Sequence, residues 1–372
     1  MTIKTLRGED MRKSFYVCVA ITALILAAGF GTGCKTGEKF QAPKIPSITP
    51  ENVTAIMAPD ENNLWLIGNY GIIFHSSDGG KNWVSQTSGI KTLLTDGMFL
   101  DNKNGWVVGI DGVIIHTGDG GTTWVKQNSG TTKHLMNITF TDKDYGWAVG
   151  EFSTVVHTAD GGKTWAPQQP EADKIYNDVC FLDRQNGFIV GEAGTMVRTI
   201  DGGAHWVPIM PKAFERKDLE DEFERPRPSL FCVIFKDKIN GWACGNFGVV
   251  LRTTDGGISW DVLPTPNLLA LYTICIKDGK GWCVGDKGTY NTSQDGGLTW
   301  KSEEETIKTK MWFRDVVFTT PDKGWIVGAG GTVISTTDGG KTWEFHSGLS
   351  YDTKAFKFFD DILAKFEKMM SE

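Results

Sequence analysis

The chain has 372 residues, and its 45 Asp and Glu residues outnumber its 38 Lys and Arg residues, giving a formal net charge of −7. This acidic balance argues against a nucleic-acid-binding protein, which needs a basic stripe. The 45 glycines and 14 tryptophans are typical of a chain rich in β-strands and tight turns. Length alone would suggest two or three domains, but an internal repeat indicates a different organisation.

An eight-residue motif, first present at residues 76–83, recurs six more times. Each copy has Ser or Thr two residues before an Asp, Gly-Gly directly after it, and Trp five residues after it. Successive motif tryptophans are 41, 41, 41, 54, 40 and 43 residues apart. A period of about 40–45 residues predicts a radial repeat that closes as one propeller. The motif aspartates are Asp78, Asp119, Asp160, Asp201, Asp255, Asp295 and Asp338.

One repeat contains the signals of four short strands. In residues 137–168, apolar runs at 137–140, 146–150 and 154–157 precede the motif, and a fourth begins at Trp165. Four short strands separated by Gly-rich turns make one propeller blade. We therefore predict an all-β fold, a seven-bladed β-propeller of four-stranded blades over residues 51–350, followed by a C-terminal amphipathic helix.

The repeated motif has a mechanical explanation. Asp160 and Thr158 can hydrogen-bond to turn amides that strand pairing leaves free. Gly161 and Gly162 adopt backbone angles closed to residues with a Cβ, and Trp165 folds a large apolar ring under the turn. Because the motif recurs seven times, we interpret it as structural rather than catalytic.

A second column of aromatic residues lies in the predicted second strands, each three residues before a glycine. Seven equivalent aromatic residues indicate packing between blades, since a ligand would need only one or two. The column consists of Trp65, Trp106, Trp147, Phe188, Trp242, Trp282 and Trp325.

The pairing of Gly146–Gly150 with His157–Trp165 resembles the BNR/Asp-box propellers, most of all those of the photosystem II stability/assembly factor type. The double signature recurs from about Val53 to Phe345. The resemblance implies seven blades, no enzymatic activity, and binding of other proteins during the assembly of membrane complexes.

Other Asp-box families are enzymes. Sialidases need three arginines for a carboxylate, plus Tyr and Glu, and the chain has no Phe-Arg-Ile-Pro segment. Xyloglucan-type glycosidases use paired carboxylates on doubled propellers, whereas this chain has one propeller. We therefore expect no enzyme, and keep as the alternative a carbohydrate-active hydrolase that uses carboxylates at the channel mouth.

Three residues before each motif Asp, five consecutive repeats carry His or Arg. A basic arc recognising an acidic partner, with more charge below about pH 6.5, is one interpretation; a hydrogen-bonded strand end is the other, and we favour it. Neighbouring blades separate these positions too widely for a shared zinc ion. The five candidate partner-binding residues are His75, His116, His157, Arg198 and Arg252.

Acidic residues recur at two other positions. Three begin predicted innermost strands, in a ring with Thr54, Asn137, Cys232 and Thr273, and three follow the second strand. They could hold a cation or act as a carboxylate pair, but capping of strand-end amides is the interpretation we favour. If strands alternate in direction, both sets lie on one acidic face, opposite the Asp motifs. The candidate channel-mouth acids are Asp96, Asp178, Asp315, Glu151, Glu192 and Asp286.

The 54-residue spacing reveals an insertion at about residues 211–229, with mixed charge and prolines at its end. Phe214, Leu219 and Phe223 have the spacing of a short helix with one apolar edge. The insertion is either a solvated excursion or a loop that binds a partner through Phe214 and Phe223.

The N-terminus indicates export. A basic start after Met11, which is a better candidate for the natural start than Met1, precedes an apolar run too short to span a membrane. Small residues before Cys34 resemble a bacterial lipobox, although Gly31 stands where that motif prefers Leu. We expect residues 1–33 to be a signal segment, Cys34 to be lipidated, and residues 34–50 to be a tether.

Five further cysteines follow Cys34, an odd number that excludes complete internal pairing. We expect buried free thiols, with a cross-strand disulfide between Cys275 and Cys283 as the exception to test. Residues 351–372 show helical spacing of apolar side chains between charges, and we expect this helix to pack on its own domain.

Together these features predict a non-enzymatic scaffold on the periplasmic side of the outer membrane. We expect its partner to be a protein of the envelope or of a membrane complex, not a nucleic acid. Contact with the membrane should be only through the lipid anchor, the protein should be monomeric, and neither metal nor cofactor is expected.

Overall fold

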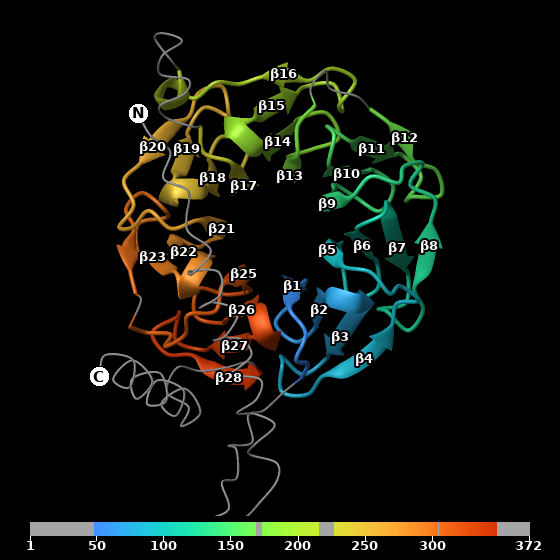
Figure 1. The fold of residues 1–372 in the computed structure, drawn as a ribbon, viewed down its shortest axis with the longest axis horizontal. Helices are drawn as coiled ribbons and strands as arrows, with labels where there is room; N and C mark the ends of the chain where they lie inside the picture. The colour runs from blue at the N-terminus through green and yellow to red at the C-terminus, as the bar shows by residue number, and fades with distance from the viewer. Residues whose placement is uncertain (1–47, 169–172, 216–226, 304, 348–372) are drawn as a thin grey trace, which may run out of the picture. The chain divides into compact units, whose positions relative to one another are not determined.

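The computed structural model describes residues 48–168, 173–215, 227–303 and 305–347. These residues form seven four-stranded antiparallel sheets around a central axis (Figure 1), which confirms the predicted seven-bladed propeller. The predicted signal segment, Cys34, most of the tether and the C-terminal helix at 351–372 lie outside the described residues. Within the described part of the chain, no helix is long and apolar enough to cross a membrane.

Each blade uses four strands that are consecutive in sequence, from the axis outward. The strands, blade by blade, are β1 (Val53–Met57), β2 (Leu64–Gly68), β3 (Ile72–Ser76) and β4 (Val84–Thr87); β5 (Leu94–Phe99), β6 (Gly105–Gly109), β7 (Val113–Thr117) and β8 (Val125–Gln127); β9 (Leu135–Phe140), β10 (Gly146–Gly150), β11 (Val155–Thr158) and β12 (Ala166–Pro167); β13 (Tyr176–Phe181), β14 (Gly187–Gly191), β15 (Met196–Thr199) and β16 (Val207–Pro208); β17 (Leu230–Phe235), β18 (Gly241–Gly245), β19 (Val250–Thr253) and β20 (Asp261–Leu263); β21 (Leu271–Lys277), β22 (Lys280–Gly285), β23 (Tyr290–Ser293) and β24 (Lys301–Ser302); β25 (Phe313–Phe318), β26 (Gly324–Gly328), β27 (Val333–Thr336) and β28 (Glu344–Ser347).

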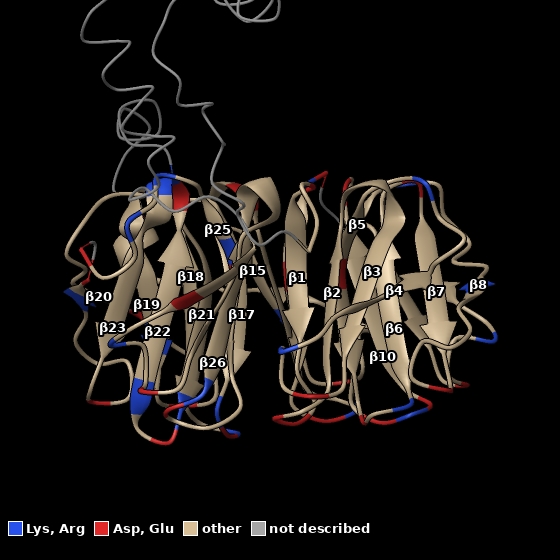
Figure 2. Cartoon of the chain, turned by 90° about the horizontal axis from the view of Figure 1, so that it is seen from below, with Lys and Arg blue, Asp and Glu red and all other residues tan. Residues whose placement is uncertain are grey.

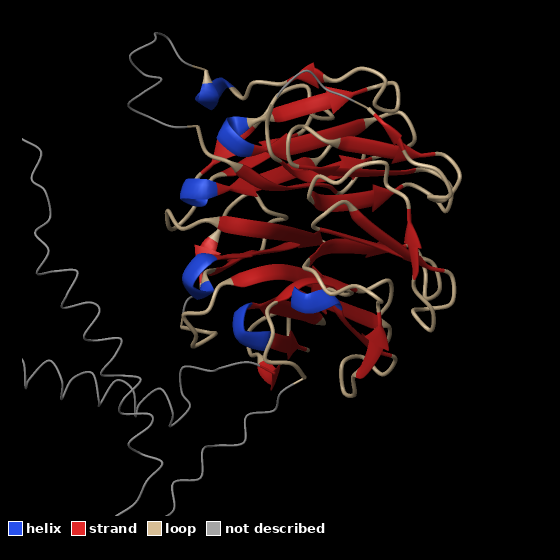
Figure 3. Cartoon of the chain, turned by 45° about the vertical axis from the view of Figure 1, so that its right-hand side comes forward, coloured by secondary structure: helices blue, strands red, loops and turns tan. Residues whose placement is uncertain are grey.

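Short 3-10 turns join the second and third strands in five blades. Figure 3 shows them at the ends of the strands. They are η1 (Asn69–Gly71), η2 (Glu192–Gly194), η4 (Asn246–Gly248), η5 (Asp286–Gly288) and η6 (Ala329–Gly331), while η3 (Lys212–Phe214) opens the insertion after β16.

The turns define two faces of the propeller. On one, which we call the motif face, each Asp motif meets the turn between the first two strands; for example, Gly79 N–H donates to the Asn62 carbonyl at 2.9 Å. On the other, the mouth face, the turn between the second and third strands meets the connection that enters the blade, as where Glu192 N–H donates to the Ile175 carbonyl at 3.0 Å. Charged residues of both signs lie at the turns on both faces (Figure 2).

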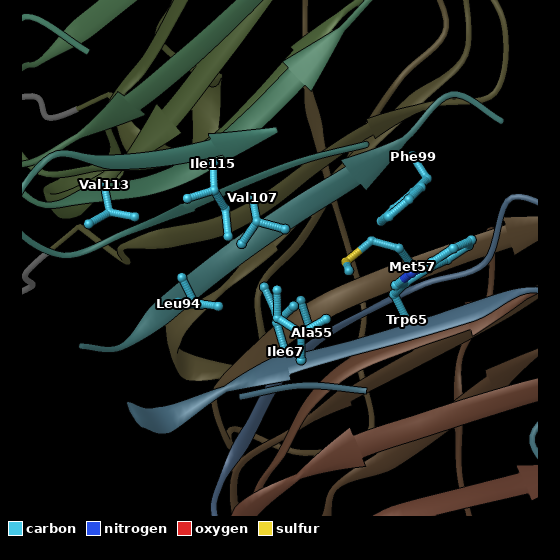
Figure 4. Packing of buried hydrophobic residues seen from close by; sticks show 10 residues of the cluster. Ala55, Met57, Trp65, Ile67, Leu94, Phe99, Val107, Val113 and Ile115 are labelled. Carbon is cyan, nitrogen blue, oxygen red and sulfur yellow. The ribbon is translucent and has the colours of Figure 1, made fainter. Parts of the chain in front are cut away.

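The core lies between blades. Second strands such as β10, with the sequence Gly-Trp-Ala-Val-Gly, are buried along their whole length, because the alternate side chains pack against the two neighbouring blades. Trp147 stacks on Phe181 of the next blade with ring centroids 3.6 Å apart, and its Nε1 donates to the Gly202 carbonyl at 3.1 Å. Figure 4 shows the corresponding contact of Trp65 with Phe99. The aromatic column therefore packs blade against blade.

The ring closes without sharing a sheet between the ends of the chain. Ser347 in β28 accepts a hydrogen bond from Ile48 N–H at 3.1 Å and donates to the Thr49 carbonyl at 3.3 Å. Asn52 Oδ1 accepts from Gly330 N–H at 2.9 Å. Ser88 makes comparable hydrogen bonds with Ile90, which lies two residues further along the continuous chain. Residues 48–52 thus occupy the place that a covalent connection takes after other blades.

Candidate functional site

The Asp motifs are saturated by their own turns. In the third blade, Asp160 Oδ1 accepts from Thr164 N–H at 2.9 Å and from the Thr158 hydroxyl at 2.9 Å. These hydrogen bonds, first of all the one from the Thr164 amide, lower the pKa of Asp160 to about 2. The same acceptance from an amide four residues later occurs at Asp78, Asp119, Asp201, Asp255, Asp295 and Asp338.

The residues of the predicted basic arc lie in the gaps between blades. His75 stacks on Trp65 with centroids 4.2 Å apart, and His157 packs against Trp147 at 4.8 Å. Burial lowers the pKa of His75, His116 and His157. These three imidazoles are therefore harder to charge than free histidine.

The two arginines of the same ring pack similarly. Arg198 lies over Phe188 and Arg252 over Trp242, each guanidinium carbon 5.7 Å from the ring centroid. The structure thus aligns the five positions as the sequence predicts, but each side chain covers an aromatic ring of its own blade.

The innermost strands bring Asp96, Asp178 and Asp315 to the channel, where they line a small cavity of about 70 Å³ together with Arg314. The strand register places Ala55, not Thr54, in this ring, because Ala55 pairs with Ile67 as Asp96 pairs with Val108. The expected membership of Thr54 was wrong.

Two of these carboxyls tie neighbouring blades together. Asp178 accepts from its own next amide, Val179, at 2.9 Å and from Val233 N–H of the next blade at 2.6 Å. Asp315 does the same with Val316 at 2.8 Å and with Ile56 across the seam at 3.0 Å. Their geometry is that of amide capping.

Burial dominates the electrostatics of these acids. It raises the pKa of Asp178 to about 6 and raises that of Asp315. Burial, with the nearby charges of Asp315 and Asp178, raises the pKa of Asp96 well above its ordinary value. Asp96 accepts a hydrogen bond from Asn137 Nδ2 at 2.5 Å.

The second acidic set lies on the mouth face, as the alternating strands predict. Glu192 Oε1 accepts from Ile175 N–H at 3.2 Å, and Asp286 Oδ1 accepts from Lys287 N–H at 2.9 Å, while Glu151 lies at the equivalent turn. Basic residues such as Lys287 and Arg227 lie on the same face, so it carries both signs of charge rather than acid alone.

The mouth face also carries exposed aromatic residues that the sequence interpretation missed. Tyr70, Phe152 and Phe247 are 68%, 59% and 55% exposed. Each is the second residue after the glycine that ends its second strand. Each has left-handed backbone, with φ of 57°, 53° and 59°. Aligning this turn column across the repeats would have revealed them.

Phe247 borders a pocket of about 540 Å³ beside the insertion. Phe214, predicted as a partner-binding residue, is only 7% exposed and lines the pocket together with Arg227 and Leu268. Phe223, predicted with it, lies outside the described residues.

The five described cysteines are free thiols, and the tested Cys275–Cys283 disulfide is absent. The reason is the register: Cys275 faces Trp282, and Cys283 faces Ile274. Among the described residues, no group of three or more His, Cys, Asp or Glu side chains is arranged to hold a metal ion.

Seven four-stranded blades, each turned by an Asp motif, define an Asp-box β-propeller. The chain belongs to the family described as Photosynthesis system II assembly factor YCF48, whose model matches residues 83–167, 165–277, 263–343 and 303–364. A comparison with curated proteins gave no match.

Solved structures share the fold. The structure titled "YCF48 bound to D1 peptide" is 21% identical with a TM-score of 0.64, covering 79% of this chain and 94% of that one. YCF48 from Cyanidioschyzon merolae is 18% identical, with a TM-score of 0.64 and coverages of 78% and 97%. A GH74 xyloglucanase from Xanthomonas campestris is 10% identical with a TM-score of 0.65, covering 83% of this chain and 56% of that one.

Proposed function

We propose that this protein is a non-enzymatic, protein-binding scaffold of the bacterial cell envelope. The observation that carries the proposal is its membership of an assembly-factor family, matched from residue 83 to residue 364. A relative with the same fold has been solved with a peptide bound, which supports capture of a protein segment as the mode of action.

The state of the channel carboxyls supports a binding role over a hydrolytic one. A glycosidase needs two carboxyl groups free to act on substrate at roughly 5–9.5 Å. Asp178 and Asp315 instead each accept two backbone amides, one of them from the neighbouring blade. These acids are committed to holding blades together.

Envelope anchoring is the second part of the proposal. The signal-like segment 1–33 followed by Cys34 supports export and lipidation, and the absence of Asp at position 35 supports delivery to the outer membrane. Residues 34–50 would tether the propeller on the periplasmic side. Cys34→Ser should move the protein from the membrane to the soluble periplasmic fraction; retention in the membrane would contradict the lipid anchor.

Affinity capture from detergent-solubilised membranes of the source organism tests the scaffold role. We expect an envelope or membrane-complex protein to be recovered with the full chain. Recovery of none above background would contradict the proposal.

A hydrolase is the second candidate, favoured by the raised pKa values of three acids at one channel. Incubation of the full chain with xyloglucan and other envelope polysaccharides distinguishes the two functions. We expect no release of reducing ends; release that Asp178→Asn and Asp96→Asn abolish would establish the hydrolase instead.

A further inference from the structure

One turn position on the mouth face holds bulky residues in several blades, although its backbone conformation favours glycine. The middle residue of the turn between the second and third strands has left-handed backbone in all seven blades, and blade 7 places a glycine there, Gly330. Left-handed backbone is unfavourable for a bulky residue and free of strain for glycine. The seven residues are Tyr70, Asp111, Phe152, Ala193, Phe247, Lys287 and Gly330.

Three of these strained positions hold a large exposed aromatic ring. Tyr70, Phe152 and Phe247 have more than half of their surface exposed, so the rings recover little of the strain by burial. Phe152 has Lys133 Nζ 4.2 Å from its ring centroid. Strained backbone and exposed aromatic residues are both concentrated at binding sites.

Phe247 differs from the other two because it borders a pocket. Its neighbours around that pocket include Val262, Leu263 and Pro264 at the end of β20 and, beyond them, Leu268, which is 80% exposed. The volume of about 540 Å³ is within the range of ligand-binding pockets. An apolar, concave surface of this size next to an exposed Phe and Leu is suited to a chain that enters it.

The lining of the pocket includes one cationic side chain, Arg227. Arg227 packs over η2, with its side chain against Gly194. Its Nε is buried and has no hydrogen-bond partner among the described residues. Glu215 also lines the pocket, but no ion pair joins it to Arg227 within the described part of the chain. A carboxylate that enters the pocket would pair with the positive charge of this guanidinium.

These features favour a peptide over a lipid surface. An anionic membrane attracts a surface of predominantly basic charge, whereas the mouth face carries both signs. A membrane also meets protruding side chains and not the floor of a pocket, where Phe214 is 7% exposed.

We propose that the pocket between Phe247, Leu268 and Arg227 binds an extended, apolar segment of a partner protein that carries an Asp or Glu side chain. This inference rests on the proposed scaffold function and names its docking surface. Phe247 and Leu268 contact the apolar side chains, and Arg227 pairs with the carboxylate.

Peptide selection on the detergent-solubilised full chain tests the proposal. A phage library of random peptides is the probe, and the most enriched sequence is then synthesised with a fluorophore for affinity measurement by anisotropy. We expect enriched sequences to combine apolar residues with one acidic residue. Absence of enrichment, or enrichment of basic sequences, would overturn the inference.

Phe247→Gly is the decisive variant, because glycine adopts the φ of 59° without strain. It should keep or raise the melting temperature while weakening peptide binding by about tenfold or more. Leu268→Ser should weaken it similarly. Ile258→Ser is the matched control, since Ile258 is an equally exposed apolar residue, 68%, in the Asp motif of the same blade. It should leave the affinity unchanged.

Two further measurements separate the remaining outcomes. Arg227→Gln should weaken binding of the acidic peptide but not binding of a peptide in which Gln replaces the acidic residue. Equal losses of affinity for both peptides would overturn the role of the guanidinium. Binding of the full chain to phosphatidylethanolamine–phosphatidylglycerol vesicles that depends on Phe247, without peptide binding, would replace a peptide by a lipid surface. If membrane capture succeeds equally with Phe247→Gly, the docking surface fails while the scaffold function stands.

Discussion

Asp178 shows how the propeller uses a carboxyl beside its axis. Water is largely excluded there, since the residue is 8% exposed, so the charged form is disfavoured and the pKa rises to about 6. Two backbone N–H groups nevertheless bond to it, because strand ends at the channel leave these donors without partners. Desolvation therefore disfavours the charged form of this carboxyl, while the two amide hydrogen bonds favour it.

This balance makes the contribution of Asp178 to stability dependent on pH. The folded protein holds the proton more tightly than the unfolded chain, whose carboxyl titrates near 3.8. The contribution is therefore complete below about pH 4 and is lost as pH rises to about 6 and above. The Asp178→Asn variant has no carboxyl that titrates at this position. The free energy of unfolding of the natural protein should therefore fall, relative to that of the variant, by up to about 3 kcal/mol between pH 4 and pH 7.

Urea unfolding of both proteins across that range measures the gap between their free energies of unfolding. Taking the difference cancels the contributions of groups that do not interact with Asp178, including the half-buried histidines, whose lowered pKa values act in the opposite direction below pH 6.5. A gap independent of pH would show that Asp178 ionises as freely as in the unfolded chain.

His157 separates the two interpretations of the basic arc. Its ring packs on Trp147, and its Nε2 is buried with no hydrogen-bond partner in the part of the chain that the structure describes. His157→Phe should therefore keep the stack and change the free energy of unfolding by less than about 1 kcal/mol. Membrane capture should also persist; its loss in a folded variant would restore the arc as a partner-binding surface.

At the scale of the element, a blade is held mainly by its neighbours. The fourth strands are short and exposed, as in β12 and β16, whereas second strands such as β10 are completely buried. A single blade therefore has no core of its own, and the aromatic rings supply contacts that its four strands cannot.

Trp147→Phe tests this packing with a replacement that the chain already uses at Phe188. The phenyl ring keeps the stack on Phe181 but loses the donor to the Gly202 carbonyl. We expect a loss of about 1–3 kcal/mol from the unmade hydrogen bond and the smaller ring. Chemical denaturation of the full chain measures it, and an unchanged midpoint would mean that the indole contributes no more than the phenyl.

The elements were predictable because one cause repeats. Gly161 and Gly162 have φ of 75° and 85°, so the motif itself requires a tight turn, and seven turns at a regular period specify seven blades. Register was less accessible. Thr54 was misplaced because it lies one residue before Ala55, which holds the ring position. Cys275 was aligned with Cys283 because the first hairpin of blade 6 is one residue shorter than that of blade 1, and sequence spacing does not fix which residues face each other.

The candidate site was less predictable than the fold. The pocket joins residues from the insertion, η4 and the connection after β20, which are brought together by the folding of the fifth blade. The predicted importance of Phe214 could be drawn from its place in an insertion. An alignment of the repeats gives the turn position of Phe247, but its exposure could not be predicted, because sequence alone does not say which side of a turn is covered.

For the whole molecule, the seam is the junction that lacks a covalent connection between adjacent blades. Ser347 is fully buried and holds Ile48 and Thr49 by hydrogen bonds like those that Ser88 makes with Ile90 within a continuous chain. Both Ser347→Ala and Ser88→Ala should cost about 1–3 kcal/mol. Their effects on local opening should differ.

Hydrogen exchange of the two variants makes this distinction. Ser347→Ala should accelerate exchange of the amides in residues 48–52 and of Gly330, because that segment has no covalent tie to blade 7. Ser88→Ala should have little effect on the rate of hydrogen exchange of the amides in residues 89–93. Equal acceleration at both sites would mean that the seam is no weaker than any other junction.

Partner binding at the mouth face is tested most directly by site-specific photocrosslinking in living cells. Benzoylphenylalanine placed at Phe247 in the full chain should crosslink to an envelope protein, whereas the same residue at Ile258, exposed on the motif face, should not. Crosslinks at Ile258 alone, or at neither position, would contradict the account.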